Sequence, residues 1–207
     1  MKEIVRLVVV LTVICIVAAA SLSEVYTLTK DPIEKAAREE KLSAMRAIVP
    51  GFDNEPDVDT VTTSDGTDDQ GNEITRTYYL AKKEGEVIAV LFESSSGAGY
   101  GGTITVIVGV TPEGAITGVQ VLKHSETPGL GTKVAKPEWL AEFVGRTLDN
   151  TKWAVTKDGG DIDYTSGATI SPRAVVAAVK EGLDGFLRHK EEILGEPRGL
   201  TETAQDE

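Results

Sequence analysis

Residues 103–123 read TITVIVGVTPEGAITGVQVLK and contain the strongest strand pattern of the chain. Every second residue from Ile104 to Val110 is apolar, and a period of two is typical of a β-strand with one buried face. Thr111-Pro112-Glu113-Gly114 follows as a turn with proline at its second position. Residues 115–123 then form a second expected strand. The stretch predicts two adjacent antiparallel strands of a sheet.

Further strand and helix signals lie on either side of this stretch. Residues 77–82 and 87–92 flank Lys83-Glu84-Gly85-Glu86, which predicts an upstream hairpin. Downstream, Ser171-Pro172 is typical of a helix start, with serine as the N-cap and proline at the first helical position. Apolar residues then recur at helical spacing, so this helix would pack on the sheet. They are Val175, Val176, Val179, Leu183, Phe186 and Leu187. The expected fold class is α+β, with an antiparallel sheet and packed helices.

The N-terminal segment has the composition of a membrane span. Residues 7–23 carry no charge, and most of them are apolar. We expect a single transmembrane helix within an anchor of residues 1–28. Lys2 and Arg6 precede the apolar run and Glu24 follows it, so the positive-inside rule places the N-terminus in the cytoplasm and the rest of the chain outside the cell (inner) membrane. The alternative is a cleavable signal peptide, because small residues end the apolar run.

The remaining segments follow from turn and capping signals. Residues 29–50 predict a stalk helix, since Asp31-Pro32 is typical of a helix start and Pro50-Gly51 would end the helix. One domain is expected over residues 51–194, followed by a polar, frayed tail of residues 195–207.

An acidic stretch precedes the predicted hairpin. Residues 53–72 are rich in Asp, Thr and Gly and lack an apolar period, so they predict a solvated loop with at most one short strand. A calcium loop of the EF-hand type is disfavoured, because Gln70 stands where that loop needs its turn glycine after Asp65, Asp68 and Asp69.

The charge balance and the cysteine count exclude some function classes. The 33 acidic side chains outnumber the 21 basic ones, and a net charge of -12 repels a polyphosphate backbone, so no nucleic-acid partner is expected. Cys15 is the single cysteine, which excludes an intramolecular disulfide and a cysteine-based metal cluster. Two histidines leave little for metal chemistry, and we expect no metal site.

A glycine-rich loop precedes the first strand described above. Gly97-Ala98-Gly99-Tyr100-Gly101-Gly102 satisfies G-x-G-x-x-G, but a strand follows it where a dinucleotide site needs a helix. We therefore interpret the loop as a turn that lets a ligand approach the backbone closely.

The segment before the last predicted helix carries a more specific pattern, Asp163-Tyr164-Thr165-Ser166-Gly167-Ala168-Thr169. A phosphate near Thr169 would lie against unpaired N–H groups at the helix start, and Gly167 and Ala168 leave the hydroxyl accessible. The segment resembles the acceptor motif Asp-x-x-(Ser/Thr)-Gly-Ala-(Thr/Ser), to which a magnesium-dependent flavin transferase attaches FMN from FAD. The resemblance implies a covalent FMN phosphoester on Thr169, with Asp163, Ser166, Gly167 and Ala168 as the recognition sequence.

A second motif agrees with the first. His124-Ser125-Glu126-Thr127-Pro128-Gly129-Leu130-Gly131 resembles a signature of the G subunit of Rnf ion-translocating electron transport complexes and of the related C subunit of sodium-pumping NADH:quinone oxidoreductase. The resemblance implies that residues 51–194 form an FMN-binding domain and that Thr127 and Leu130 pack against the isoalloxazine ring. The full set of cofactor-binding residues implied outside the acceptor motif is His124, Glu126, Thr127, Leu130, Gly131, Tyr100 and Gly101.

These resemblances imply an electron-carrying subunit without catalytic side chains of its own. It would work beside the other membrane and redox subunits of an Rnf-type complex that couples electron transfer between ferredoxin and NAD to ion translocation, after maturation by the flavin transferase. A membrane-anchored FMN-binding adaptor or regulatory subunit of another respiratory complex is the alternative. A secreted hydrolase is disfavoured, because Ser166 lacks the G-x-S-x-G elbow.

Overall fold

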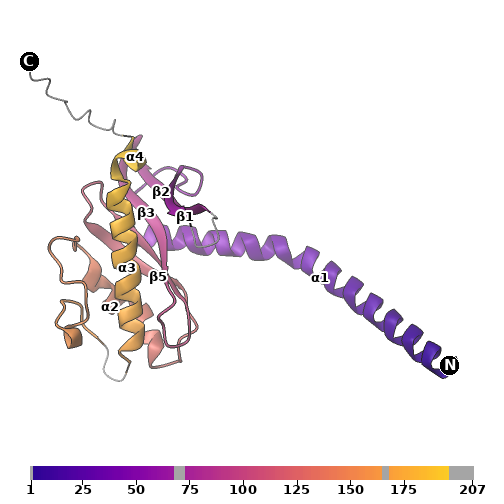
Figure 1. The fold of residues 1–207 in the computed structure, drawn as a ribbon. Helices are drawn as coiled ribbons and strands as arrows, with labels where there is room; N and C mark the ends of the chain where they lie inside the picture. The colour runs from indigo at the N-terminus through magenta and orange to yellow at the C-terminus, as the bar shows by residue number, and fades with distance from the viewer. Residues whose placement is uncertain (1, 68–72, 165–167, 196–207) are drawn as a thin grey trace, which may run out of the picture. The chain divides into compact units, whose positions relative to one another are not determined.

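The structure is a computed structural model that describes residues 2–67, 73–164 and 168–195. The chain divides into two compact units, Met1–Leu42 and Ser43–Glu207. The second unit holds an antiparallel sheet with helices packed on it (Figure 1). The predicted α+β class is therefore confirmed. Most of the expected polar tail lies outside the described residues.

Helix α1 runs without interruption from Lys2 to Ile48. It contains a segment long and apolar enough to cross a membrane, and none of that segment is buried within the protein. The expected helix start at Asp31-Pro32 is wrong, because Pro32 lies inside α1. Proline removes one backbone donor, the one that would bond the carbonyl of Leu28, while the turns on either side keep theirs. The helix ends as expected, at Pro50-Gly51, where Gly51 has a φ of 92°.

Five antiparallel strands form one sheet within the described residues, in the order β1-β2-β3-β4-β5. They span Thr60–Thr67 (β1), Glu73–Lys83 (β2), Glu86–Ser96 (β3), Ile104–Val110 (β4) and Ile116–Lys123 (β5). Each strand pairs with its neighbour in sequence. Glu84 and Gly85 turn the β2–β3 hairpin with φ values of 53° and 87°, as a two-residue hairpin loop of type I′ requires. Both hairpins predicted from the sequence are confirmed.

Helix α3 covers one face of the sheet with its apolar side. It spans Ile170–Arg188 and packs against β3 and β4 (Figure 1); α4, Lys190–Leu194, follows it. The ring of Phe186 lies 6.3 Å from that of Phe92 and 6.4 Å from that of Tyr78. A Cβ atom on Gly182 would lie only 2.5 Å from the Phe92 ring, so the absence of a side chain there lets α3 approach the sheet. The predicted packing of this helix is confirmed except at Leu187, which is 37% exposed.

The opposite face of the sheet is covered by the last turn of α1, within the second unit. Gly109 of β4 and Gly118 of β5 are paired and lie on this face. A Cβ atom on Gly118 would lie 2.9 Å from Cβ of Ile48, and one on Gly109 would lie 3.0 Å from Cγ2 of Val49. The two glycines therefore form a seat for Ile48 and Val49, both of which are buried.

The connection between β5 and α3 is folded around aromatic side chains, which the sequence patterns did not predict. Its short helices are η1 (Gly131–Ala135), α2 (Pro137–Leu140), η2 (Ala141–Phe143) and η3 (Thr156–Asp158). The buried Phe143 ring lies 5.3 Å from that of Trp139 and 6.3 Å from that of Trp153. The indole N–H of Trp139 donates to the carbonyl of Asp163 at 2.7 Å. This bond fixes the backbone of Asp163, the first residue of the segment predicted to accept FMN.

The acidic stretch is more ordered than a solvated loop. Residues 60–67 form β1, and Asp65 in this strand has only 8% of its side chain exposed. Its carboxylate accepts a hydrogen bond from Nε of Arg76 at 3.1 Å and lies 3.0 Å from Nε2 of His189. Desolvation opposes ionisation, but the hydrogen bonds from Arg76 and His189 outweigh it and hold the pKa of Asp65 below its ordinary value. Asp68, Asp69 and Gln70 lie outside the described residues.

The Asp65 cluster predicts a pH-dependent contribution to stability. Asp65→Asn should lower the free energy of unfolding at neutral pH by about 2–3 kcal/mol, because Arg76 loses its less exposed carboxylate partner and keeps, among the described residues, only the exposed Glu181. The folded-state pKa of Asp65 is depressed, so this stabilisation is present above the unfolded-state pKa and is lost as the pH falls through the folded-state pKa.

Urea unfolding of the full chain in detergent would test this. The difference between wild type and variant should shrink below about pH 4. Asp149→Asn, at an exposed aspartate, is the matched control and should change little. A difference for Asp65→Asn that stays constant from neutral to acid pH would contradict the assignment.

Candidate functional site

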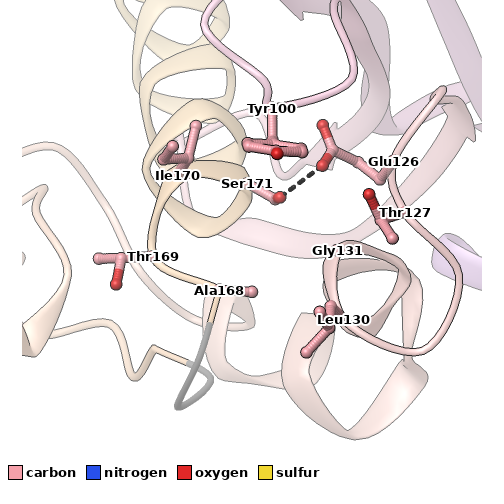
Figure 2. Close-up of a pocket in the computed structure, with 9 residues that line it drawn as sticks. All are labelled: Tyr100, Glu126, Thr127, Leu130, Gly131, Ala168, Thr169, Ile170 and Ser171. Atoms are coloured by element: carbon pink, nitrogen blue, oxygen red, sulfur yellow. Dashed lines mark hydrogen bonds between the residues drawn. The ribbon is translucent and has the colours of Figure 1, made fainter.

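A pocket of about 310 Å³ lies where three segments meet (Figure 2). They are the glycine-rich loop, the octapeptide of residues 124–131 and the start of α3. Its volume is at the lower end of the range for small-molecule sites. The pocket is lined by Tyr100, Glu126, Thr127, Leu130, Gly131, Ala168, Thr169, Ile170 and Ser171. All but Ile170 and Ser171 belong to the motifs singled out in the sequence. The fold therefore brings residues of the glycine-rich loop, the octapeptide and the segment before α3 to one place.

The carboxylate of Glu126 lies at the centre of this arrangement. Only 5% of the residue is exposed, and its two oxygens bond to different segments. Oε1 accepts the N–H of Gly101 at 3.1 Å, and Oε2 accepts the hydroxyl of Ser171 at 2.6 Å (Figure 2). Buried carboxylates need such donors, because an unpaired one costs several kcal/mol. Glu126 thus joins the octapeptide to the glycine-rich loop and to α3.

Glycines surround Glu126 where a side chain would not fit. A Cβ atom on Gly131 would lie 2.6 Å from Oε2 of Glu126, and one on Gly99 would lie 2.6 Å from Oε1. A Cβ atom on Gly101 would collide with the carbonyl of Ser125. The glycine-rich loop leads into β4 and not into a helix, as predicted. Its glycines therefore serve close contact between backbone and the Glu126 carboxylate.

The octapeptide folds into a tight turn that presents Leu130. The carbonyl of Thr127 accepts hydrogen bonds from the N–H groups of Leu130 and Gly131 at 3.3 and 3.0 Å. Gly129 has a φ of 78°, a conformation that other residues rarely adopt, and its N–H donates to the hydroxyl of Thr132. Leu130 remains 49% exposed beside the pocket, so an apolar side chain faces the opening.

Thr169 is the N-cap residue of α3, which begins at Ile170. The expected N-cap role of Ser171 is wrong, because its hydroxyl is used by Glu126 and the helix starts before it. The first turn of α3 carries no acidic residue. Figure 2 shows Thr169 at the edge of the pocket, with its side chain directed away from the Glu126–Ser171 pair. Its hydroxyl therefore lies beside a helix N-terminus, where an anion is stabilised.

The other residues predicted for the site lie around the pocket or beyond it. His124 does not line it; Nδ1 of His124 accepts the N–H of Glu126 at 3.2 Å and so fixes the backbone at that position. The side chain of Asp163 is exposed and is not among the described residues lining the pocket. Ser166 and Gly167 lie outside the described residues. Among the parts of the chain that are described, no group of three or more His, Cys, Asp or Glu is suited to a metal ion.

Two lining residues were not predicted from the sequence. Ile170 is 45% exposed and follows Thr169 directly, so an apolar residue next to the predicted acceptor was the signal available in the sequence. Ser171 appeared only as a helix cap, and its true partner lies 45 residues earlier in the chain. No local pattern reports a contact across that separation.

Known proteins are similar to the part of the chain that builds this pocket. The sequence model of the family described as the FMN-binding domain matches residues 99–184, a range that contains residues 99–102 of the glycine-rich loop, the octapeptide and most of α3. A protein of Cereibacter sphaeroides, named as the G subunit of an ion-translocating oxidoreductase complex, is 41% identical over 186 residues, which cover 86% of this chain and 82% of that protein. A protein of Aliivibrio fischeri with the same name is 38% identical over 195 residues, with coverages of 91% and 92%.

This chain belongs to the G-subunit family. The resemblance to G subunits of Rnf-type complexes, drawn above from two motifs, is therefore confirmed. Among solved structures, NqrC of Shewanella oneidensis matches this family member with a TM-score of 0.50 and 25% identity, over 68% of this chain and 74% of that one. The C subunit of the Na⁺-translocating NADH-quinone reductase of Parabacteroides distasonis has a TM-score of 0.50 and 18% identity, over 67% and 78% of the chains, and shows the shared fold alone.

The Glu126 contacts of this G-subunit family member make a residue-level prediction. Glu126→Ala removes the acceptor of the Gly101 N–H, so that amide should exchange with solvent about tenfold faster. Ser171→Ala is the matched control, because it removes the partner of Oε2 and leaves the acceptor of Gly101 in place. Hydrogen exchange by NMR or mass spectrometry measures both. Unchanged Gly101 protection in Glu126→Ala would show that the carboxylate does not hold the loop.

Proposed function

We propose that this chain carries FMN as a phosphoester on Thr169 and passes electrons within a membrane complex that couples electron transfer between ferredoxin and NAD to ion translocation. The proposal rests on the observation that Thr169 and residues of the octapeptide line the same pocket. The two motifs are far apart in the sequence, and each resembles a flavin-site motif independently of the other. Membership of the G-subunit family supports the setting in an ion-translocating complex.

The pocket residues fit a tricyclic ring linked to a phosphate. The side chains of Leu130 and Ile170 are about half exposed at the opening, and Tyr100 is 71% exposed, so apolar surface is available to cover a planar ring. The Thr169 hydroxyl lies at the pocket edge, where the phosphate would be attached, and the flexible ribityl chain would lead inward. Bound FMN would supply one- and two-electron transfer, whereas the chain sets its position and surroundings.

Contacts within the chain hold the residues of this site in fixed positions. Glu126 fixes the glycine-rich loop and the start of α3 through the Gly101 and Ser171 bonds. The Thr127 turn holds Leu130 against the opening, and α3 holds Thr169 and Ile170 on a helix packed onto the sheet. Electron transfer depends steeply on distance, so an attached and fixed carrier suits a relay between neighbouring subunits.

The proposed partners are the other membrane and redox subunits of an Rnf-type complex, together with a flavin transferase that loads Thr169. We further propose that α1 crosses the cell membrane once, with Lys2 and Arg6 on the cytoplasmic side and the FMN-binding domain outside. An N-terminal signal sequence can also contain a long apolar segment, so cleavage is the competing outcome for this segment. A non-carrying adaptor with the same fold is the competing function.

Replacement of the acceptor tests attachment. Thr169→Ala should give a chain of unmodified mass without flavin fluorescence on a denaturing gel, because no hydroxyl remains to form the ester. Thr169→Ser should retain part of the modification, since it keeps a β-hydroxyl but loses the methyl group that restricts its rotamer. Thr127→Ala, in the same pocket, should be modified like wild type. Flavin found on a different residue of the wild-type chain, or none in cells that contain the transferase, would overturn the proposal.

Replacement of Leu130 separates holding the ring from attaching the phosphate. Leu130→Ala should keep the phosphoester but shift the visible absorption spectrum or reduction potential of the flavin, because an apolar contact with the ring is lost. Electron flow through the assembled complex should fall, although the variant carries as much FMN as the wild type. Val144→Ala is the control, at an apolar residue that is similarly exposed and is not among those lining the pocket. If the Leu130→Ala variant has the spectrum, potential and turnover of the wild type, Leu130 does not contact the flavin ring.

Protease access tests the orientation. Protease added to sealed right-side-out vesicles should cleave within residues 43–207, because the positive-inside rule places them outside. Vesicles opened with detergent show whether packing within the complex protects the chain. If the protease cleaves the domain only after the vesicles are opened, and the complex itself does not protect it, the assigned orientation is reversed. Release of the domain without detergent would indicate cleavage of the N-terminal segment.

A further inference from the structure

Lys157 meets the proposed acceptor, although no motif pointed to it. Its ammonium Nζ lies 3.4 Å from Oγ1 of Thr169, and the two residues come from separate elements, η3 and the cap of α3. Nζ also lies 5.9 Å from the centre of the Tyr164 ring, within the range of a cation–π interaction. An exposed cation therefore stands at the atom to which the phosphate would be bonded.

The short helix that carries Lys157 is held in place by buried neighbours. Val155 and Ile162, which flank it, are 1% and 0% exposed and form a β-bridge. The carbonyl of Val155 accepts the N–H groups of Asp158 and Gly160 at 2.8 and 3.1 Å. A Cβ atom on Gly160 would collide with the carbonyl of Ala154, so this turn is closely packed. The backbone of Lys157 is thus fixed while its side chain reaches outward.

The carboxylate next to Lys157 is bound by another cation. Asp158 accepts two hydrogen bonds of 2.6 Å from Arg173, which lies in the first turns of α3. These bonds hold the pKa of Asp158 below its ordinary value, so the carboxylate stays ionised and paired with Arg173. The pair also ties η3 to α3. It leaves the Lys157 ammonium directed at Thr169.

The charge around Thr169 contrasts with the chain as a whole. The net charge of the protein is -12, yet the hydroxyl has the Lys157 ammonium beside it and the N-terminus of a helix without acidic residues in its first turn. An ammonium and a helix N-terminus both favour a phosphate oxygen. A local cation in an acidic protein is expected where an anion must be brought close.

We propose that Lys157 pairs with the phosphoryl group joined to Thr169 and speeds its attachment. This inference rests on the proposed FMN site. In the transfer, the Thr169 oxygen forms a bond to the flavin-side phosphorus of FAD, the pyrophosphate bond breaks, AMP leaves and the hydroxyl proton is released, without exchange of electrons. The ammonium offsets negative charge on the phosphoryl oxygens during this step and on the phosphodiester that results.

The loading rate of the full chain tests this role. The chain would be purified in a phosphorus-free detergent from cells that lack the transferase, then incubated with purified transferase, FAD and Mg²⁺. Fluorescence on denaturing gels and intact mass give the initial rate. Lys157→Gln should load about fivefold more slowly than wild type at low salt, and the difference should shrink at high salt. Lys157→Arg, which keeps the charge, should load nearly as wild type.

Lys180→Gln is the matched control for the loss of one positive charge. Lys180 is exposed on the same helix that Thr169 caps, and a rise of 1.5 Å per residue places it about 16 Å further along. Its loading rate should match wild type. The ³¹P resonance of the completed phosphodiester gives a second readout, and it should move in Lys157→Gln but not in Lys180→Gln.

The outcomes separate this inference from the proposed function. A wild-type chain without flavin on Thr169 defeats the proposed function itself. With wild type loaded on Thr169, equal rates for wild type and Lys157→Gln defeat only the role of Lys157. A slow Lys157→Gln that Lys157→Arg does not rescue indicates a steric role, and an unchanged ³¹P resonance indicates contact with the transferase; either result overturns the pairing with phosphate.

Discussion

A buried carboxylate must be matched by hydrogen-bond donors, and the site depends on how Glu126 meets that requirement. Its donors are a backbone N–H in the glycine-rich loop and a hydroxyl at the start of α3, which come from sequence positions on either side of it. The glycine-rich loop has neither the length nor the apolar content to fix itself, whereas α3 packs on the sheet. Because the carboxylate is costly to bury unpaired, all three segments are favoured in one arrangement. The pocket is the space that this arrangement leaves open.

Helix α3 connects this site to the stability of the domain. Its apolar side packs on β3 and β4 around Phe92 and Phe186, while its first residues form one wall of the pocket. Ser171 belongs to that wall, and its hydroxyl donates a hydrogen bond to Glu126. The position of Thr169, the proposed acceptor, is therefore set by the main core of the domain, and loss of α3 packing would disturb the site.

Much of this architecture could be predicted from local sequence, because alternation and helical spacing are local properties. The hairpins at Gly85 and Gly114 and the apolar side of α3 follow from patterns that span a few residues. The motifs located most of the pocket through family resemblance. The helix start expected at Asp31-Pro32 was a local error, whereas the errors within the domain depended on distant partners. β1 contains Asp65 with its side chain largely shielded because Arg76 and His189 lie beside the carboxylate, and His189 lies 124 residues away. Ser171 was assigned to the nearest helix end because its distant acceptor was not visible in the sequence.

The seat formed by Gly109 and Gly118 determines where a soluble fragment of this protein can begin. Ile48, the last residue of the helix that carries the apolar segment, and Val49 directly after it fill that seat. A fragment that starts at Pro50 would expose a strip of bare sheet to water and invite association with other chains. One that starts at Ser43 would retain the covering turn, so the last turn of the anchor helix is a structural part of the domain that follows it.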